Sequence, residues 1–510
     1  MQAGYTTDVP FPATFAPQQA PIHVAAIAAL SGVDGAFDDS FAYCDFGCGE
    51  GLTVALLAAC YPQARFYGVD VNPAHIEAAR AFAKGCAIDN VDFIEADFLA
   101  FESGALPPLD YAAISGVYSW LPAEKRRGLA SIVSSGLKAG GACAVQYRCM
   151  PGVAPRIATD GLATFLAAQS SGASSARIVT ALGAISNLLG APDLPFNRVN
   201  PTARDYLKEQ LAADPNYLAH DVLNADHAGV WFHQVAADFR ASGLDFVAQL
   251  RPQMNACPDL FEPQLAQRFS LAAGGYDDPI AGQELINIAV NAGSRWDLFV
   301  KPRSGSTEAR RTPPLRRLFV RGLAGVDHRA PRQALSGRVT VDLFAPVYDA
   351  ALDMLASEDV AGETLMEKLA AQASETTARR ALMNLLAIGL IGFSAAPSIE
   401  TAAIAAPAFS ATERRLLFET LRYEKPQPFP SRRLGNCVPL PLRDRAILAS
   451  MAVDSVEAAW ALIEEKGASV RTAGGREIMS LERFKAFLSE EGADFRAQRL
   501  PALLRLGLFQ

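Results

Sequence analysis

The stretch that decides the fold of the N-terminal part of the chain is Asp45-Phe46-Gly47-Cys48-Gly49-Glu50-Gly51. It ends a short apolar run at residues 41–46, and the apolar residues 52–59 that follow have the composition of a buried helix. Glycines let a backbone turn sharply and approach a ligand, and the start of a helix presents free amide groups. The sequence therefore predicts a strand, a ligand-binding turn and a helix.

The same alternation continues over the next hundred residues. Further strands are predicted at 65–70, 91–95, 111–115 and 142–147, with helices from Pro73 to about residue 87 and at 123–137. Strands and helices that alternate at this spacing predict an α/β fold, a doubly wound, mostly parallel sheet of Rossmann type. Ligands bind such sheets beyond the carboxyl ends of the strands.

Acidic residues lie at the ends of three successive predicted strands. Asp45 precedes the glycine turn, Asp70 closes the second strand, and Asp97 follows the third. A dinucleotide site has the pattern Gly-x-Gly-x-x-Gly, but here Gly51 comes one residue early. An acid before the turn suits a ligand with a cationic amino-acid end, and Asp70 suits ribose hydroxyls. Each acid alone would be a solvated loop residue or a helix cap, but the three together favour a nucleoside site.

With these motifs, residues 41–147 resemble the class I S-adenosylmethionine-dependent methyltransferases. The resemblance implies S-adenosyl-L-methionine as the cofactor. The positions that match the cofactor-binding motifs of this family are Asp45, Phe46, Gly47, Cys48, Gly49, Gly51, Asp70, Val71, Asn72, Asp97, Phe98, Ser115 and Gly116.

The N-terminal leader, residues 5–15, is rich in aromatic residues and prolines. It is either a strap that packs on the sheet or a lid over the cofactor, and Tyr5 and Phe15 are the candidates for the second role. Tyr5 is included among the cofactor-binding candidates.

Aromatic residues directly follow the fourth predicted strand, in Gly116-Val117-Tyr118-Ser119-Trp120-Leu121-Pro122. Such residues usually fill a core. In this fold, however, the acceptor meets the methyl group at that position. We therefore take Tyr118 as a candidate for binding the acceptor and for orienting or deprotonating it. Trp120 is a second substrate-binding candidate, and Tyr147 is a second catalytic candidate.

Residues 153–300 lose the strand pattern and predict a mostly helical domain, with helices at 160–168 and 175–189 and with Asp160 as a helix N-cap. His220, His227 and His233 suggest a metal cluster, but no acid completes a ligand spacing, so we expect no metal.

The motifs Tyr217-Leu218-Ala219-His220 and Trp231-Phe232-His233, together with residues 5–15 and 117–122, extend the resemblance to about residue 305. They resemble a bacterial group that couples a class I methyltransferase to a methyltransferase regulatory domain. This group includes the rickettsial outer-membrane-protein lysine methyltransferases.

The rest of the chain divides into a Pro/Arg-rich linker at 301–338 and a C-terminal region at 339–510. A solvated hinge is favoured for the linker over a docking strip for an acidic partner. Residues 384–391 and 502–509 echo each other, since in both an apolar helix runs into glycine and a short apolar segment. This pattern predicts a winged-helix-like α/β region of one or two units. Only Arg379 and Arg380 lie on its predicted recognition helix, so we expect protein docking or dimerisation and no nucleic-acid partner.

Bulk properties agree with a cytoplasmic globular protein. The 510 residues carry a net charge of −8, and the sequence shows no membrane span, no signal peptide and no Cys-x-x-Cys pair among its eight cysteines. Three functions remain open. The first is a protein lysine N-methyltransferase whose acceptor is a surface or secreted protein before export. The second is an O- or N-methyltransferase of a small molecule or surface glycan. The third is a non-catalytic, cofactor-sensing interaction protein, and a homodimer is compatible with each.

Overall fold

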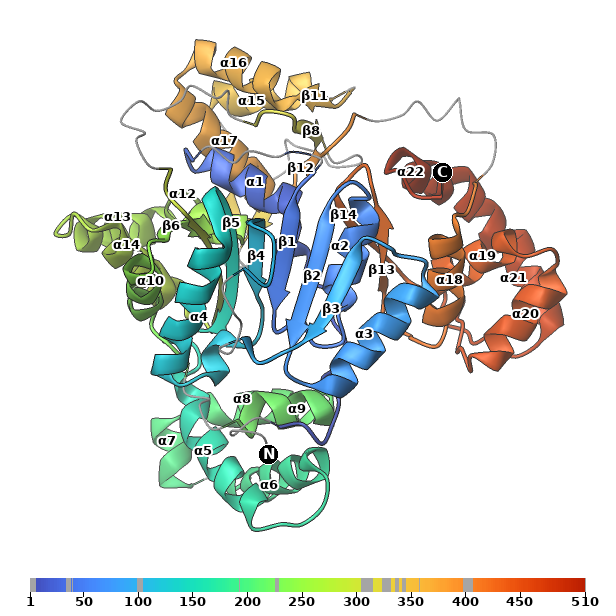
Figure 1. Ribbon diagram of the computed structural model, residues 1–510, viewed down its shortest axis with the longest axis horizontal. Helices are drawn as coiled ribbons and strands as arrows, with labels where there is room; N and C mark the ends of the chain where they lie inside the picture. Colours follow the sequence, from blue (N-terminus) through green and yellow to red (C-terminus); the bar gives the residue numbers. More distant parts are fainter. Residues whose placement is uncertain are drawn as a thin grey trace.

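A seven-stranded sheet lies at the centre of the protein (Figure 1). The computed structural model describes residues 6–33, 38, 40–98, 104–191, 193–224, 229–303, 315–322, 332–334, 339–341, 345–356, 358–397 and 407–509. The strand order is β3-β2-β1-β4-β5-β7-β6, in which β1 to β5 are parallel and β7 runs antiparallel to β5 and β6. The strands are β1 (Ala42–Phe46), β2 (Arg65–Asp70), β3 (Val91–Glu95), β4 (Leu109–Ile114), β5 (Leu137–Arg148), β6 (Asp245–Gln249) and β7 (Ser294–Val300).

Helices cover both faces of this sheet, as the sequence predicts. Helices α1 (Pro21–Leu30), α2 (Leu52–Cys60) and α3 (Pro73–Gly85) share one core with Tyr43 and Phe66. Helix α4 (Ala123–Gly136) shares the other core with Cys44 and with α10 (Phe232–Ala241). Tyr43 and Cys44 are neighbours on β1 and face opposite sides because strand side chains alternate.

The middle of the chain is mostly helical, as expected, but it also supplies the last two strands of the sheet. Strands β6 and β7 lie beyond the predicted domain boundary at residue 152, and neither is predicted from the sequence. Strand β7 carries Arg295 and Asp297, which are both fully buried and bonded to each other. Two charged residues interrupt the apolar pattern of the strand, so the local sequence does not show that it is buried.

A separate group of helices in this region forms what we call the helical lobe, seen below the sheet in Figure 1. It consists of α5 (Ala154–Ala168), α6 (Ser174–Leu189), α7 (Pro195–Val199), α8 (Ala203–Leu211) and α9 (Pro215–Val222). Helix α5 begins six residues before the predicted start, so the prediction of Asp160 as an N-cap is wrong. The remaining helices, α11 (Pro252–Asn255), α12 (Cys257–Leu260), α13 (Pro263–Ala273) and α14 (Pro279–Val290), belong with α10 to the part of the chain that supplies β6 and β7.

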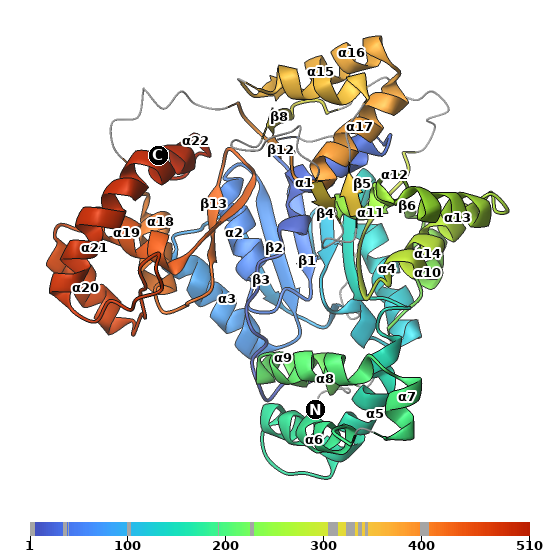
Figure 2. The same cartoon turned by 180° about the vertical axis from the view of Figure 1, so that it is seen from behind.

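The C-terminal region folds as two parts that lie against the sheet domain (Figure 2). The first combines α15 (Pro346–Met354), α16 (Gly362–Gln372) and α17 (Glu375–Ala387) with a sheet of β8 (Phe319–Gly322), β11 (Val360–Ala361) and β12 (Ile391–Ser394). The second contains α18 (Ala411–Thr420), the hairpin β13 (Gln427–Ser431) and β14 (Asn436–Leu440), α19 (Leu442–Ala452), α20 (Val456–Glu465), α21 (Leu481–Asp494) and α22 (Leu500–Arg505). A small ribbon joins β9 (Arg332–Ala334) to β10 (Val339–Val341).

The echoed segments of this region adopt similar turns. Gly389 after α17 and Gly507 after α22 have φ angles of +76° and +77°. The first turn leads into β12, whereas after the second the backbone N–H of Ala408 donates to the carbonyl of Phe509. The winged-helix assignment stays a prediction. Strand β8 lies within the predicted linker, of which residues 304–314 are outside the described ranges.

Helix α1 shows how closely the C-terminal region is attached. Every residue of α1 except His23 is buried, because the sheet covers one side and α17 lies on the other. Arg379 on α17 donates to the carbonyl of Ala29 at 2.5 Å, and Arg380 forms an ion pair with Asp259. Both arginines of the predicted recognition helix therefore make bonds within the chain.

The hairpin β13–β14 makes a second junction, on helix α2. The hydroxyl of Tyr61, at the end of α2, donates to the carbonyl of Gly435 at 2.6 Å. Gly435 has a φ angle of +58°, and a Cβ atom there would lie 2.3 Å from the Tyr61 hydroxyl oxygen. The hairpin can approach α2 this closely only because residue 435 is glycine.

We therefore expect Gly435→Ala to lower the free energy of unfolding by about 2–3 kcal/mol, since it adds both strain at positive φ and overlap with Tyr61. Gly475→Ala is the matched control, because Gly475 also has positive φ (+80°) but no described atom lies within 4 Å of the position that its Cβ would take. The control should lose only about 1 kcal/mol in chemical denaturation. Equal losses for the two variants would contradict this account of the junction.

Candidate functional site

The glycine turn after β1 is held in place by the neighbouring strand. The carbonyl of Val69 on β2 accepts hydrogen bonds from the backbone N–H groups of Gly47 (2.8 Å) and Cys48 (3.1 Å). Gly51 has positive φ, and a Cβ atom there would lie 2.4 Å from the ring of Phe93. Gly49 also has positive φ, but none of the described atoms lies within 4 Å of the position that a Cβ would take. The turn is thus packed on one side and leaves the backbone at Gly49 open to a ligand.

Asp70 closes β2 and is 6% exposed. Its Oδ2 accepts from the backbone N–H of Gly49 at 2.9 Å, and its Oδ1 accepts from that of Asn72, also at 2.9 Å. Asn72 in turn caps α3 by accepting from the N–H of Ala74. A third group, Nδ1 of His75, lies 3.4 Å from Asp70 Oδ1. The carboxylate therefore joins the glycine turn to the first turn of α3.

Asp45 lies beside this arrangement and is 3% exposed. Its Oδ1 has no hydrogen-bond partner among the described residues. Burial, together with the charge of Asp70, raises the pKa of the Asp45 carboxyl to about 8. A buried carboxyl with an unpaired oxygen is costly unless a ligand completes it, and a cationic group would do so best.

The other cofactor candidates lie at the same edge of the sheet but differ in exposure. The backbone N–H of Gly116, after β4, donates to Gln146 Oε1 at 2.8 Å. Asp97 is exposed, whereas the side chains of Phe98 and Phe46 are buried, which leaves mainly the backbone of Phe46 for a ligand. Val71, Cys48 and Ser115 are partly buried. Tyr5 lies outside the described residues.

Both catalytic candidates are buried tyrosines whose hydroxyls donate to carboxylates. The Tyr118 hydroxyl donates to Asp238 Oδ2 at 3.0 Å, and that of Tyr147 donates to Asp297. Burial and the adjacent carboxylate raise the pKa of each phenol. A phenol that is buried and already hydrogen-bonded to a carboxylate is poorly placed to accept a proton, so this geometry does not favour the predicted catalytic role of either tyrosine.

A group of rings from three parts of the chain lies near these strand ends. The centre of the Phe11 ring lies 6.0 Å from the ring centre of Trp120, 6.1 Å from that of Tyr217 and 5.4 Å from that of His220. Phe11 and Trp120 are partly exposed, and Tyr217 is 39% exposed. Of the two lid candidates, Phe15 packs against the core beside α2. Phe11 is the described leader residue that reaches the site, and it is not predicted from the sequence because no local pattern distinguishes it.

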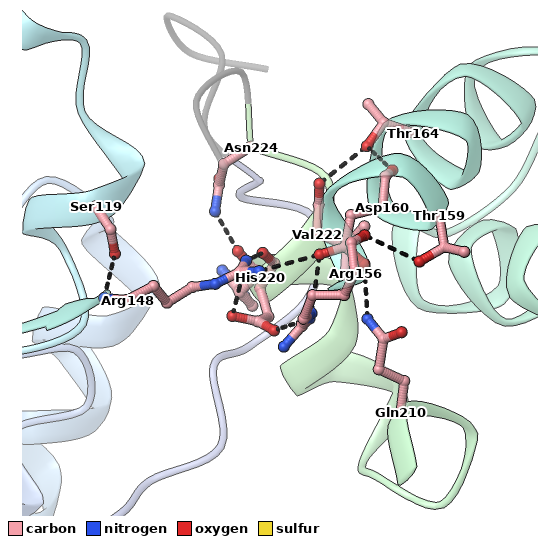
Figure 3. A network of polar contacts seen from close by, with 11 residues as sticks. Ser119, Arg148, Arg156, Thr159, Asp160, Thr164, Gln210, His220, Val222 and Asn224 are labelled. Atoms are coloured by element: carbon pink, nitrogen blue, oxygen red, sulfur yellow. Dashed lines mark hydrogen bonds and ion pairs between the residues drawn. The ribbon is translucent and has the colours of Figure 1, made fainter. Parts of the chain in front are cut away.

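A largely buried set of charges that we call the polar network joins β5 to the helical lobe (Figure 3). Arg148 at the end of β5 and Arg156 on α5 both donate to Asp160 Oδ2 at 3.0 Å. Arg156 also pairs with Asp221 on α9 at 2.7 Å, and Gln210 on α8 donates to Asp160 Oδ1 at 2.9 Å. The backbone N–H of Arg148 donates to Ser119 Oγ, in the turn between Tyr118 and Trp120. The network therefore fixes the lobe relative to the loop after β4.

The predicted absence of a metal rested on the three histidines. His220 Nε2 donates to the carbonyl of Val9 at 2.9 Å, His233 Nδ1 lies 2.8 Å from Glu284, and His227 is outside the described residues. The described residues contain no group of three or more His, Cys, Asp or Glu side chains that could hold a metal ion. Within the described ranges, no helix has the length and apolar character needed to cross a membrane.

Comparison with known proteins finds two family matches. Residues 44–143 match a family described as a methyltransferase domain, and residues 214–301 match one described as a predicted methyltransferase regulatory domain. The second match includes α10 and both of the strands, β6 and β7, that are not predicted from the sequence.

Curated relatives match parts of the chain. An uncharacterised Synechocystis protein is 28% identical over 303 residues, which is 58% of this chain and 58% of the relative. An uncharacterised protein of Rickettsia prowazekii is 24% identical over 45% of this chain and 41% of its own length. A trans-aconitate 2-methyltransferase of Azoarcus is 36% identical over 17% of this chain and 31% of its own length. The chain thus spans about half the length of the first curated relatives it matches.

The whole fold is similar to a solved structure, PKMT2 from Rickettsia typhi in complex with AdoHcy. The similarity covers 96% of this chain and 99% of that protein, with a TM-score of 0.64 and 16% sequence identity.

The polar network gives a test of how the lobe is held. We expect Asp160→Asn to lower the free energy of unfolding by about 3 kcal/mol, because it leaves the buried Arg148 and the partly buried Arg156 with one carboxylate fewer. Asp205→Asn, on the exposed side of α8, should change it by less than about 0.5 kcal/mol. Denaturant unfolding followed by circular dichroism would measure both. Equal stabilities of the two variants would show that the network does not hold the lobe.

Proposed function

We propose that the protein is an S-adenosylmethionine-dependent methyltransferase that methylates lysine side chains of a protein acceptor. The proposal starts from the matches to a methyltransferase domain at residues 44–143 and to a predicted methyltransferase regulatory domain at residues 214–301. The observation that carries the enzyme assignment is the pair of buried carboxylates, Asp45 and Asp70, on either side of the open glycine turn. The protein acceptor is supported by the similarity of the whole fold to PKMT2 from Rickettsia typhi.

The residues present fit S-adenosylmethionine. The unpaired oxygen of Asp45 suits the ammonium group of the amino-acid end, and Asp70 suits the ribose hydroxyls. The backbone at Gly49, which donates to Asp70, is open to a ligand. Asp97 and Phe98 are our further candidates for the adenine side, and Ser115 and Gly116 at the end of β4 are further candidates for contact with the cofactor. When bound, the cofactor supplies an activated methyl group, so the protein's task is to orient the acceptor and to exclude water.

The rings of Phe11, Trp120 and Tyr217 are placed to receive the acceptor. Partly exposed ring faces attract an ammonium group, and a site that removes water lowers the pKa of the amine and so favours its neutral, nucleophilic form. Tyr118 contributes indirectly in this proposal, because its bond to Asp238 fixes the turn that carries Trp120. The ammonium group loses its proton to solvent water as it enters the site, before the methyl group is transferred.

A second candidate is a small-molecule acceptor. The trans-aconitate 2-methyltransferase similarity favours it, although that similarity covers only 17% of the chain. The similarity of the whole fold to PKMT2 outweighs it. A cytoplasmic location, an acceptor modified before export, and a homodimer remain our predictions.

The decisive experiment supplies S-adenosylmethionine labelled in its methyl group to the protein and a host lysate. We expect label in protein that hydrolyses to methyl-lysine. Asp70→Ala should abolish labelling and weaken S-adenosylhomocysteine binding at least about thirtyfold, since each hydrogen bond to a charged group contributes about 1.5–3 kcal/mol. Label in the small-molecule fraction would instead favour the second candidate. Binding by the wild type without any labelled acceptor would favour a non-catalytic, cofactor-sensing protein.

The raised pKa of Asp45 gives a separate test of the cofactor site. With a pKa of about 8, about 90% of the carboxyl is protonated at pH 7. An ammonium group beside it stabilises the ionised form, so binding should release up to about 0.9 proton, and affinity should rise from pH 6 to 8. Titration calorimetry of S-adenosylhomocysteine in buffers of different ionisation enthalpy measures this release. Asp45→Asn should remove it, and an unchanged release in that variant would contradict the assignment.

A further inference from the structure

The N-terminal segment 6–16, which we call the strap, connects the helical lobe to the cofactor edge of the sheet. At one end, Asp8 accepts hydrogen bonds from the backbone N–H (2.8 Å) and the hydroxyl (2.7 Å) of Ser174, the first residue of α6. The carbonyl of Val9 accepts from His220 on α9. At the other end, the backbone N–H of Ala16 donates to Thr53 Oγ1 on α2 at 3.1 Å. The strap therefore spans the two parts of the chain that the methyltransferase site needs.

Between these ends, the strap is bonded to His75. The backbone N–H of Phe11 donates to His75 Nε2 at 3.3 Å, and His75 is 1% exposed. A backbone N–H can only donate, so Nε2 must be the bare nitrogen of the ring. The proton is then on Nδ1, which lies 3.4 Å from Asp70 Oδ1. A docked strap thus fixes both the tautomer and the orientation of the ring that donates to Asp70.

We propose that His75 is a positioning residue that couples the docked strap, and through it helices α6 and α9, to the cofactor carboxylate Asp70. The inference rests on the proposed function, because it takes Asp70 as the carboxylate that binds the cofactor ribose. Through this coupling, helices α6 and α9 of the helical lobe can change the affinity of the protein for the cofactor.

The coupling follows from what each bond fixes. Asp70 receives two donors from its own edge of the sheet, Gly49 and Asn72, and the third from His75. If the strap leaves, the His75 ring loses the N–H that sets its orientation, and its bond to Asp70 weakens. If the cofactor binds more tightly when the His75 ring is positioned by the strap, then the bound cofactor must raise the docking equilibrium of the strap by the same factor. This follows because the coupling between two binding events is reciprocal.

Two separate substitutions of His75 test its positioning role. His75→Gln keeps one donor and one acceptor in a neutral side chain, whereas His75→Leu has neither. We expect His75→Leu to weaken S-adenosylhomocysteine binding about tenfold and to speed hydrogen exchange of the amides in residues 6–16. His75→Gln should stay within about threefold of the wild type in binding. In the wild type, the ligand should slow exchange in the strap.

A second variant tests the coupling from a distance and remains informative if His75→Leu fails to fold. Asp8→Ala removes the carboxylate that accepts from Ser174 at the start of α6, at the far end of the strap, where Asp8 touches neither His75 nor Asp70 in any described contact. It should weaken S-adenosylhomocysteine binding about threefold to tenfold, because the docked strap loses both hydrogen bonds that Asp8 accepts from Ser174. Asp278→Ala is the matched control, since Asp278 caps α14 outside the strap, and it should leave binding unchanged.

The outcomes separate the two proposals. Absence of S-adenosylhomocysteine binding to the wild-type protein would overturn the proposed function. Wild-type binding that Asp8→Ala and a folded His75→Leu both leave unchanged would overturn the coupling alone. Equal losses in His75→Leu and His75→Gln would also overturn it, because the hydrogen-bonding groups of the side chain would then have no part in the effect.

Discussion

The rest of the site depends on the position of the Asp70 carboxylate, which meets three backbone or side-chain donors at the end of β2. Phe46 pairs with Val69 in the sheet, so Asp70 follows directly beside the glycine turn. Its two oxygens then bind the turn on one side and the start of α3 on the other. Any ligand that approaches the open backbone at Gly49 meets this carboxylate and, next to it, the uncompensated carboxyl of Asp45. Two ionised carboxyl groups in one buried place would repel each other, so Asp45 stays largely protonated until a cationic ligand lies beside it.

Much of this edge can be predicted from the sequence because it is built from local signals. Strands β1 to β5 are built around short apolar runs, Asp45 and Asp70 lie at the ends of β1 and β2, and the glycines of the turn follow β1 immediately. The structure confirms the sheet and the turn for that reason. Prediction from the sequence fails where a residue's role depends on a distant partner. Asp160 precedes an apolar run and so resembles a cap, but it lies inside a helix and binds Arg148 and Arg156.

Strand β7 and His75 are further examples of the same limit. Arg295 is fully buried in β7, where its guanidinium lies 3.9 Å from the centre of the Phe232 ring and binds Asp297. Such a residue is buried only because its partners are present, and the sequence of the strand does not show them. His75 meets a backbone N–H that is 64 residues away in the chain. No periodicity marks either residue.

The position of β6 and β7 changes how the regulatory region should be understood. The same part of the chain completes the sheet, pairs with β5 along seven residues, and supplies Asp297 to Tyr147. It is therefore a structural continuation of the methyltransferase domain and not a separate attachment. The helical lobe differs, because it meets the cofactor edge through two kinds of contact. The polar network at Arg148 is buried and charge-paired, which makes its loss costly. The strap contacts are single hydrogen bonds, most of which are partly exposed and involve a backbone group, although the bond between Val9 and His220 is buried. Of the two attachments of the lobe, the strap is therefore the weaker, and the polar network is the one that fixes its position.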